Sequence, residues 1–294
     1  MIGKLKRTIA VVNKQKQLRQ ILEDMESVAV AYSGGVDSTL LLKLALDCLD
    51  AGRVVALTAV SASVPSRELE EAQAIAQQLG ARHVLIESQE TEDPRYLANA
   101  PNRCYFCKSD VYGRLIDYAE REGYKVVVDG TNADDADDHR PGRQAARERG
   151  VRSPLQDAGF GKLEIRNLAH ALELPNWDKP AAACLSSRIP YGTPITLEIL
   201  SQVEQAELAL KDMGFGQLRV RHHDLIARIE VAPDDFSEVL MYRGEILEKL
   251  QALGYTYVTL DLAGFRSGSM NEALTSDARR GTTSGHGETE TTAG

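Results

Sequence analysis

The chain has 294 residues, 43% of them hydrophobic, and a formal charge of −9 at pH 7. That length and apolar content predict a soluble protein with room for two domains. The acidic balance argues against a long nucleic acid as partner, because proteins that hold one usually carry a positive face. No run of about 18 apolar residues occurs and the N-terminus lacks the apolar core of a signal, so we expect no membrane partner and a cytoplasmic location.

Strands and helices are predicted to alternate in the first two thirds of the chain. Residues 4–25 have apolar positions at helical spacing and predict a leading amphipathic helix. We then expect strands at 28–32, 53–60, 83–86 and 125–129, and helices at 37–49, 66–79, 105–121, 142–149 and 162–172. This alternation predicts an α/β fold, a parallel sheet with helices on both faces, whose ligands bind beyond the carboxyl ends of the strands. Segments 33–38, 59–63 and 130–135 would meet at that edge.

The pattern changes after residues 191–194. A helix at 196–213, strands at 217–221 and 227–231, a helical region at 234–253 and a strand at 257–261 predict a smaller α+β unit. We therefore expect an α/β domain at 1–192 and an α+β domain at 193–273, which we assign to substrate binding and oligomerisation. Residues 274–294 have almost no apolar side chains and are predicted to be disordered.

Residues 31–39, Ala-Tyr-Ser-Gly-Gly-Val-Asp-Ser-Thr, join the first sheet strand to a helix through a glycine turn. The glycines let a ligand approach the backbone, and the first amides and positive dipole end of the helix favour an anion there. The Gly-Lys-Ser/Thr of a Walker loop is missing. Instead, Ser-Gly-Gly-x-Asp-Ser resembles the PP-loop of ATP pyrophosphatases, which grips the β,γ-pyrophosphate leaving group while AMP passes to a substrate.

Four cysteines at uneven spacing do not predict a secreted disulfide framework. Cys104 and Cys107 form a Cys-x-x-Cys pair at a helix start, which fits half a zinc site, a redox pair or two packed cysteines. Cys184 lies among small residues with Lys179 and Arg188 nearby, whose charges would lower its pKa and favour a nucleophile. Cys48 lies among leucines and is predicted to be core.

Three cysteines are one short of a closed zinc or iron–sulfur site. A 4Fe-4S cluster held by Cys104, Cys107 and Cys184 would leave one iron open for a ligand such as sulfide. A nucleophilic Cys184 beside a structural Cys104/Cys107 pair is the competing arrangement. The sequence leaves both open.

Seven motifs in order resemble the LarE family, ATP-dependent enzymes that insert sulfur into the organic part of the nickel-pincer nucleotide cofactor of lactate racemase. They are Ser33–Ser38, Arg103-Cys-Tyr-Phe-Cys-Lys108, Asp129-Gly-Thr-Asn-Ala-Asp134, Cys184-Leu-Ser-Ser-Arg188, Arg219-Val-Arg221, Ala227-Arg-Ile-Glu230 and Gly264-Phe-Arg-Ser-Gly-Ser269. The resemblance runs from about residue 5 to residue 272.

The resemblance implies adenylation of pyridinium-3,5-biscarboxylic acid mononucleotide by ATP with Mg²⁺, followed by attack of sulfur on the mixed anhydride. Some family members sacrifice the sulfur of the cysteine that matches Cys184, and others resemble cluster-bearing forms, which we favour here because all three cysteines are present. The expected ATP-binding residues are Ala31, Ser33, Gly34, Gly35, Val36, Asp37, Ser38, Val60 and Gly130, with Asp37 also placed on Mg²⁺.

An anionic substrate fits the arginines of the smaller unit. In the strand at 217–221, Arg219 and Arg221 share one face because side chains alternate, and guanidinium groups fork onto phosphates and carboxylates. The expected substrate-binding residues are Arg188, Arg219, Arg221, Glu230 and Arg266, with Cys184 as the catalytic residue. We also expect a homo-oligomer. The alternatives are a PP-loop tRNA thiolase, an amidotransferase-type ATP pyrophosphatase and a non-enzymatic nucleotide-sensing or iron–sulfur scaffold.

Overall fold

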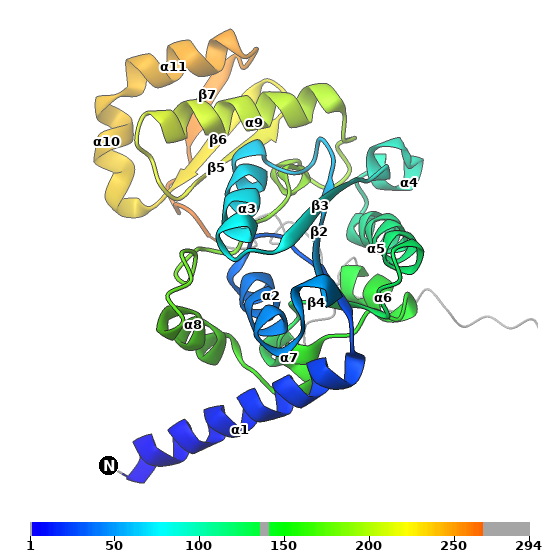
Figure 1. Cartoon of the computed structure of the whole chain (residues 1–294). Coiled ribbons are helices and arrows are strands. Elements are labelled where there is room, and N and C mark those ends of the chain that lie inside the picture. Colours follow the sequence, from blue (N-terminus) through cyan, green and yellow to red (C-terminus); the bar gives the residue numbers. More distant parts are fainter. Residues whose placement is uncertain (1, 136–140, 267–294) are drawn as a thin grey trace, which may run out of the picture. The chain divides into compact units, whose positions relative to one another are not determined.

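The computed structural model describes residues 2–135 and 141–266 of the chain, and these fall into two compact units (Figure 1). The first unit combines the chain up to Glu90 with Cys104–Ala183. The second combines Thr91–Arg103 with the chain from Cys184 onward. The predicted disordered tail at 274–294 lies outside the described residues.

The first unit contains a four-stranded parallel sheet, as the alternation of elements predicts. Its strands are β1 (Val28–Ala31), β2 (Val54–Val60), β3 (Arg82–Glu87) and β4 (Val126–Asp129), in the order β3-β2-β1-β4. The central strand β1 pairs in parallel with both β2 and β4, and Ala31 lies opposite Leu57 on one side and Asp129 on the other. The loops that leave β1, β2 and β4 therefore begin at one edge of the sheet.

Helices cover both faces of this sheet (Figure 1). On one face, the core formed with the sheet takes side chains from α1 (Ile2–Met25), α2 (Val36–Cys48), α3 (Ser66–Gln78), α7 (Pro154–Asp157) and α8 (Lys162–Ala171). On the other, it takes them from α5 (Arg103–Arg121) and α6 (Pro141–Glu148). Alternation along β1 divides its side chains, because Val28 and Val30 join the first core and Ala29 joins the second.

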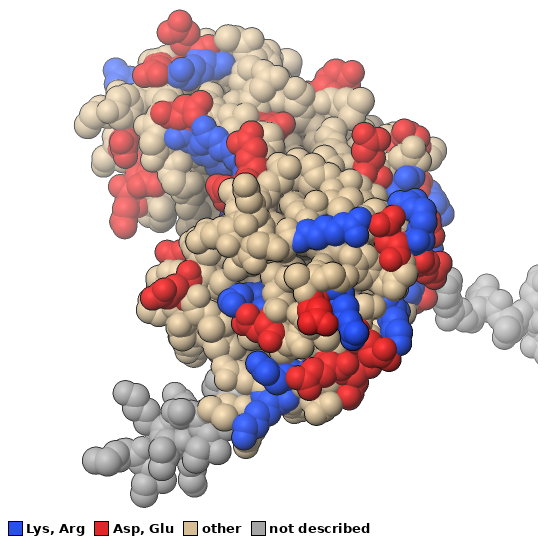
Figure 2. Space-filling model, viewed as in Figure 1, with Lys and Arg blue, Asp and Glu red and all other residues tan. Residues whose placement is uncertain are grey.

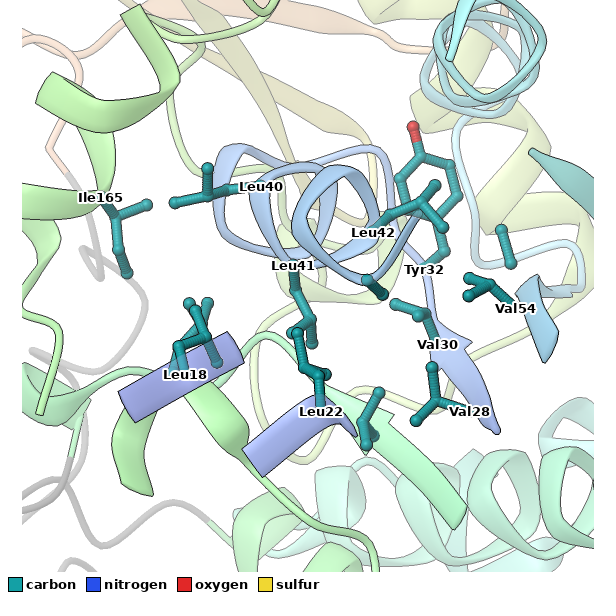
Figure 3. Close-up of a cluster of buried hydrophobic side chains, with 14 of the residues drawn as sticks. Leu18, Leu22, Val28, Val30, Tyr32, Leu40, Leu41, Leu42, Val54 and Ile165 are labelled. Atoms are coloured by element: carbon teal, nitrogen blue, oxygen red, sulfur yellow. The ribbon is translucent and has the colours of Figure 1, made fainter. Parts of the chain in front are cut away.

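The first core is built largely from leucines of α1 and α2. Leu40, Leu41 and Leu42 are completely buried; Leu41 lies toward Leu22 of α1, and Leu40 lies toward Ile165 of α8 (Figure 3). Each such leucine contributes about 1.5–3 kcal/mol of transfer free energy. This packing fixes the start of α2 directly after β1. Cys48, at the end of α2, packs against the same cluster, which confirms its predicted place in the core.

The second unit contains a mixed three-stranded sheet in the order β5-β6-β7. Its elements are α4 (Pro94–Leu97), α9 (Leu197–Asp212), β5 (Leu218–His223), β6 (Ile226–Val231), α10 (Phe236–Met241), α11 (Arg243–Ala252) and β7 (Tyr257–Leu260). Strands β5 and β6 are antiparallel, and β6 pairs in parallel with β7. The helical region predicted at 234–253 is two helices, separated at Tyr242.

Within the described part of the chain, no helix is long and apolar enough to cross a bilayer. On the face drawn in Figure 2, basic and acidic side chains are interspersed and neither sign gathers into a continuous field. The viewed surface thus offers no broad positive area of the kind that binds a nucleic acid backbone.

Candidate active site

The turn between β1 and α2 has the shape of an anion site. Gly34 has a φ of +70°, a conformation that favours glycine, and a Cβ at this position would lie 2.6 Å from the Cβ of Ala72 on α3. The N-cap residue of α2 is Gly35, which has no side chain that could cap the helix. The first amides of α2 therefore keep their hydrogen-bonding capacity for a ligand.

Two serines brace this turn from inside. The Ser38 hydroxyl donates to the Gly35 carbonyl over 3.1 Å and accepts from the Ser33 amide over 3.3 Å. The Ser33 hydroxyl lies 3.2 Å from it. The side chains of the turn thus support its backbone with hydrogen bonds of their own.

The loop that leaves β4 presses against the start of α2. A Cβ on Gly130 would lie 2.8 Å from the Ser38 amide nitrogen, so only glycine lets the two backbones approach this closely. Buried Asp129 fixes the loop, since it accepts from the hydroxyls of Thr131 (3.0 Å), Ser153 (2.7 Å) and Tyr112 (3.2 Å). Burial raises the pKa of Tyr112, which therefore stays a donor. The structure brings the predicted segments 33–38 and 130–135 together at this point.

Asp37 is the carboxylate at the mouth of the turn. Its Oδ2 accepts from Asn132 Nδ2 over 3.1 Å and lies 3.5 Å from Lys162 Nζ, at the start of α8. Its Oδ1 is buried and has no hydrogen-bond partner among the described residues. A buried carboxylate oxygen without a partner is costly unless a ligand completes it, and Mg²⁺ prefers such oxygen ligands. Asp37 therefore fits the predicted magnesium role.

The loop that leaves β2 is held by a buried acid that the sequence analysis did not single out. Glu90 is 2% exposed, and its Oε1 accepts from the hydroxyls of Ser61 and Ser63. The carbonyl of Val60 accepts from the Ser88 amide over 3.0 Å. Val60 is the last residue of β2, as Ala31 is the last residue of β1. Both therefore lie at the carboxyl edge of the sheet, where the turn at 33–38 begins.

The three cysteines of the predicted cluster are divided between the two units. Cys104 and Cys107 lie near the start of α5 and belong to the first unit, whereas Cys184 belongs to the second. None of them forms a disulfide. Neither unit by itself holds all three thiols, and no group of three or more His, Cys, Asp or Glu side chains able to hold a metal ion occurs among the described residues. The cluster stays a prediction.

Cys184 is the N-cap of a short 3-10 helix, Leu185–Arg188, and is half-buried. Arg188 anchors this turn: its Nη1 donates to the Cys184 carbonyl over 2.9 Å, while Nε and Nη2 fork onto Glu207 at 2.9 and 2.8 Å. Arg221 adds a second anchor by donating to the Ser187 carbonyl over 2.9 Å. The thiol-bearing turn is therefore held from two directions within its own unit.

Both cations that the sequence places near Cys184 are paired with carboxylates. Burial opposes the charge on Lys179, but hydrogen bonds to Glu68 and Glu71 outweigh it and raise the pKa of the ammonium group. Burial likewise opposes ionisation of Glu207, but the paired Arg188 lowers its pKa. Both charges are thus offset by partners of opposite sign.

Two of the predicted substrate arginines, Arg219 and Arg221, share one face of β5, and their cross-strand partners on β6 are Glu230 and Arg228. Arg221 Nη2 donates to the fully buried Glu230 over 2.7 Å, and Arg228 donates to the same carboxylate over 3.0 Å. The guanidinium of Arg219 lies over the ring of Phe265. Arg266 lies 3.8 Å from Asp261, which follows β7. As alternation predicts, Leu218 and Val220 pack into the core behind them.

Several site residues were missed by sequence reasoning. Glu207 did carry a signal, because it falls on the buried stripe of α9 with Leu200, Val203 and Leu210, where a charge needs a partner. Asn132 lies in the segment 130–135 that the strand pattern places beside 33–38, although its bond to Asp37 could not be read from the sequence. Lys162 carried no signal, since folding alone brings it to Asp37 from 125 positions away.

Comparisons with known proteins agree with this architecture. Residues 10–101 match the NAD synthase family. A Lactiplantibacillus plantarum protein named pyridinium-3,5-bisthiocarboxylic acid mononucleotide synthase is 42% identical over 90% of this chain and 96% of its own length. An uncharacterised protein of Synechocystis sp. is 48% identical over 90% of this chain and 98% of its own length. An uncharacterised protein of Methanocaldococcus jannaschii is 31% identical over 82% of this chain and 92% of its own length.

These relatives span nearly the whole of both chains, and the nucleotide turn stands where the NAD synthase match places a PP-loop domain. The chain therefore belongs to the LarE family of PP-loop, ATP-dependent sulfurtransferases.

Proposed function

We propose that this chain uses ATP to convert a carboxylate of pyridinium-3,5-biscarboxylic acid mononucleotide into a thiocarboxylate, a step in nickel-pincer cofactor synthesis for lactate racemase. The name of the L. plantarum relative supports the substrate. The observation that carries the proposal is the turn at 33–38, where the start of α2 has no side-chain cap and the buried Asp37 Oδ1 has no partner among the described residues.

The first step activates an inert acid. A carboxylate oxygen of the substrate attacks the α-phosphorus of ATP, the bond to the bridging oxygen breaks, and pyrophosphate leaves with the electron pair. The Val36 amide at the start of α2 and the Lys162 ammonium would hold the departing charge. Mg²⁺ on Asp37 would offset the charge of the phosphates. The product is a mixed anhydride of the substrate and AMP.

The second step transfers sulfur. In the sacrificial route, the Cys184 thiolate attacks the anhydride carbonyl, the bond to AMP breaks, and a thioester forms. Cys184 then loses its α-proton, its Cβ–S bond breaks, and the thiocarboxylate leaves behind dehydroalanine. The anchors Arg188 and Arg221 would orient the turn.

We favour a protein that carries a 4Fe-4S cluster on Cys104, Cys107 and Cys184, which would supply sulfide without loss of the cysteine. Supporting this, Arg103 belongs to the same unit as Cys184 and immediately precedes Cys104. Asn99 accepts from Arg103 and donates to the Pro190 carbonyl over 2.8 Å. The substrate roles of Arg188, Arg219, Arg221, Glu230 and Arg266, a cytoplasmic location and a homo-oligomer stay predictions.

Cys184→Ala is expected to abolish thiocarboxylate formation while ATP binding stays within about twofold of the parent, because the nucleotide turn lies elsewhere. Product is measured by mass spectrometry of the mononucleotide and ATP binding by titration calorimetry. In anaerobically purified protein, the cluster form predicts about four irons per chain, lost in Cys184→Ala and Cys104→Ala alike.

Cys48→Ala is the matched control, because Cys48 packs in the core of the first unit and should leave both product and iron unchanged. Normal product formation by Cys184→Ala would remove this thiol from the mechanism. Stoichiometric zinc in place of iron would contradict the cluster while leaving the sacrificial route in place.

A further inference from the structure

The segment that leads to Cys184 is attached to the nucleotide turn by one buried amide. Asn176 is 5% exposed, and its Nδ2 donates to the Gly34 carbonyl and to the Thr39 hydroxyl, both over 2.9 Å. These two acceptors lie on either side of the start of α2. The contact joins positions 142 residues apart in the sequence, so only the fold creates it.

The geometry of the turn explains why Gly34 needs this partner. A peptide's amide and carbonyl point in opposite directions, so a turn that presents its amides to an anion directs its carbonyls back into the protein. A buried carbonyl without a donor is costly. Asn176 supplies the donor for the Gly34 carbonyl.

The chain after Asn176 is tied to the same neighbourhood. Lys179 pairs with Glu68 and Glu71 at 2.8 and 2.6 Å on α3, the helix that also contacts Gly34. Arg166 on α8 donates to the Lys179 carbonyl over 2.9 Å. Cys184 follows five residues later in the sequence.

We propose that Asn176 is a positioning residue that transmits occupancy of the nucleotide turn to the segment leading to Cys184. Pyrophosphate seated on the amides of the turn would fix the Gly34 peptide, and through Asn176 this would order residues 177–183. The inference rests on the proposed function only in assigning the turn to ATP. The order of residues 177–183, which lead to Cys184, would then depend on whether a nucleotide is bound.

The test is amide hydrogen exchange of the full chain with and without ATP and Mg²⁺, in the absence of the second substrate so that no turnover occurs. In the parent, saturating ATP should slow exchange over 33–39 and also over 177–183, the latter by about tenfold, the equivalent of one well-made buried hydrogen bond. Asn176→Asp keeps the shape of the side chain but places a carboxylate oxygen against the Gly34 carbonyl. In this variant, saturating ATP should still slow amide exchange over 33–39 but should no longer slow it over 177–183.

Asn176→Ser provides a second variant without added charge, because its hydroxyl is too short to reach both acceptors, and it should also lose the response of 177–183. Arg166→Gln is the matched control: it releases the same segment from α8, so exchange there should be faster, yet ATP should still slow it by the parental factor.

If ATP slows exchange over 33–39 in the parent but not over 177–183, the coupling alone is overturned. The same follows if both Asn176 variants show the parental slowing over 177–183. No response at 33–39 would overturn the coupling and the nucleotide turn together. ATP binding without pyrophosphate release in the presence of the mononucleotide would instead contradict the proposed function and leave the coupling intact.

Discussion

Glu207 shows how one buried carboxylate organises the thiol-bearing turn. Its side chain is 5% exposed, and it accepts from Arg188 and from the Val220 amide over 3.0 Å. Arg188 in turn holds the Cys184 carbonyl. The acid therefore links the core of the second unit to its reactive turn.

Glu207→Gln should destabilise the second unit by about 3 kcal/mol at pH 7, because it leaves the Arg188 cation buried without its counter-charge. The pKa of Glu207 lies below its ordinary value of 4.5 in the folded protein. The pair thus contributes stability above that value and loses it as pH falls through the folded pKa. The difference between parent and variant should shrink below about pH 4.5.

The measurement is native-state hydrogen exchange of the β5 and β6 amides, which reports opening of the second unit. Glu248→Gln, an exposed acid on α11, is the control and should match the parent at every pH. A constant gap between parent and Glu207→Gln down to pH 3 would contradict this account.

At the scale of elements, the close contact between the β4 loop and the start of α2 predicts that ATP binding is sensitive to the side chain at position 130. Gly130→Ala would place a methyl 2.8 Å from the Ser38 amide and 3.0 Å from the Asp37 carbonyl carbon. The loop must then move off the start of α2, which should weaken ATP binding by about tenfold while the sheet stays folded. Titration calorimetry and the melting temperature measure the two effects.

Gly52→Ala is the matched control, because a Cβ there meets nothing within 4 Å. Its ATP affinity and melting temperature should equal those of the parent. Equal ATP affinity in Gly130→Ala would show that the β4 loop does not shape the nucleotide turn.

Elements with a clear period were predicted to within one or two residues. Helix α3, for example, is predicted at 66–79 and found at Ser66–Gln78. The single-turn helices α4 and α7 were missed, because four residues are too few to show a period. The turn at 33–38 has a sequence signal of its own, and the strand pattern predicts that the segment of Asn132 lies beside it. Lys162 and Asn176 have no such signal, since each reaches the turn through tertiary contact alone.

At the scale of the whole molecule, the chain passes between the two units at Glu90/Thr91, Arg103/Cys104 and Ala183/Cys184. Two of the three cysteines singled out by sequence are thus the first residues after a crossing. The nucleotide turn lies in the first unit and the arginine-rich sheet face in the second. The proposed ATP chemistry and the proposed substrate recognition thus concern different parts of the fold.

The most direct test follows the fate of ATP. Purified chain is incubated with ATP and Mg²⁺, with either the biscarboxylate mononucleotide or bulk tRNA, and the nucleotide and phosphate products are separated. We predict AMP and pyrophosphate in equal amounts, formed with the mononucleotide and not with tRNA. Release of ADP and orthophosphate, or no ATP binding at all, would contradict the assignment of the turn at 33–38 to adenylation.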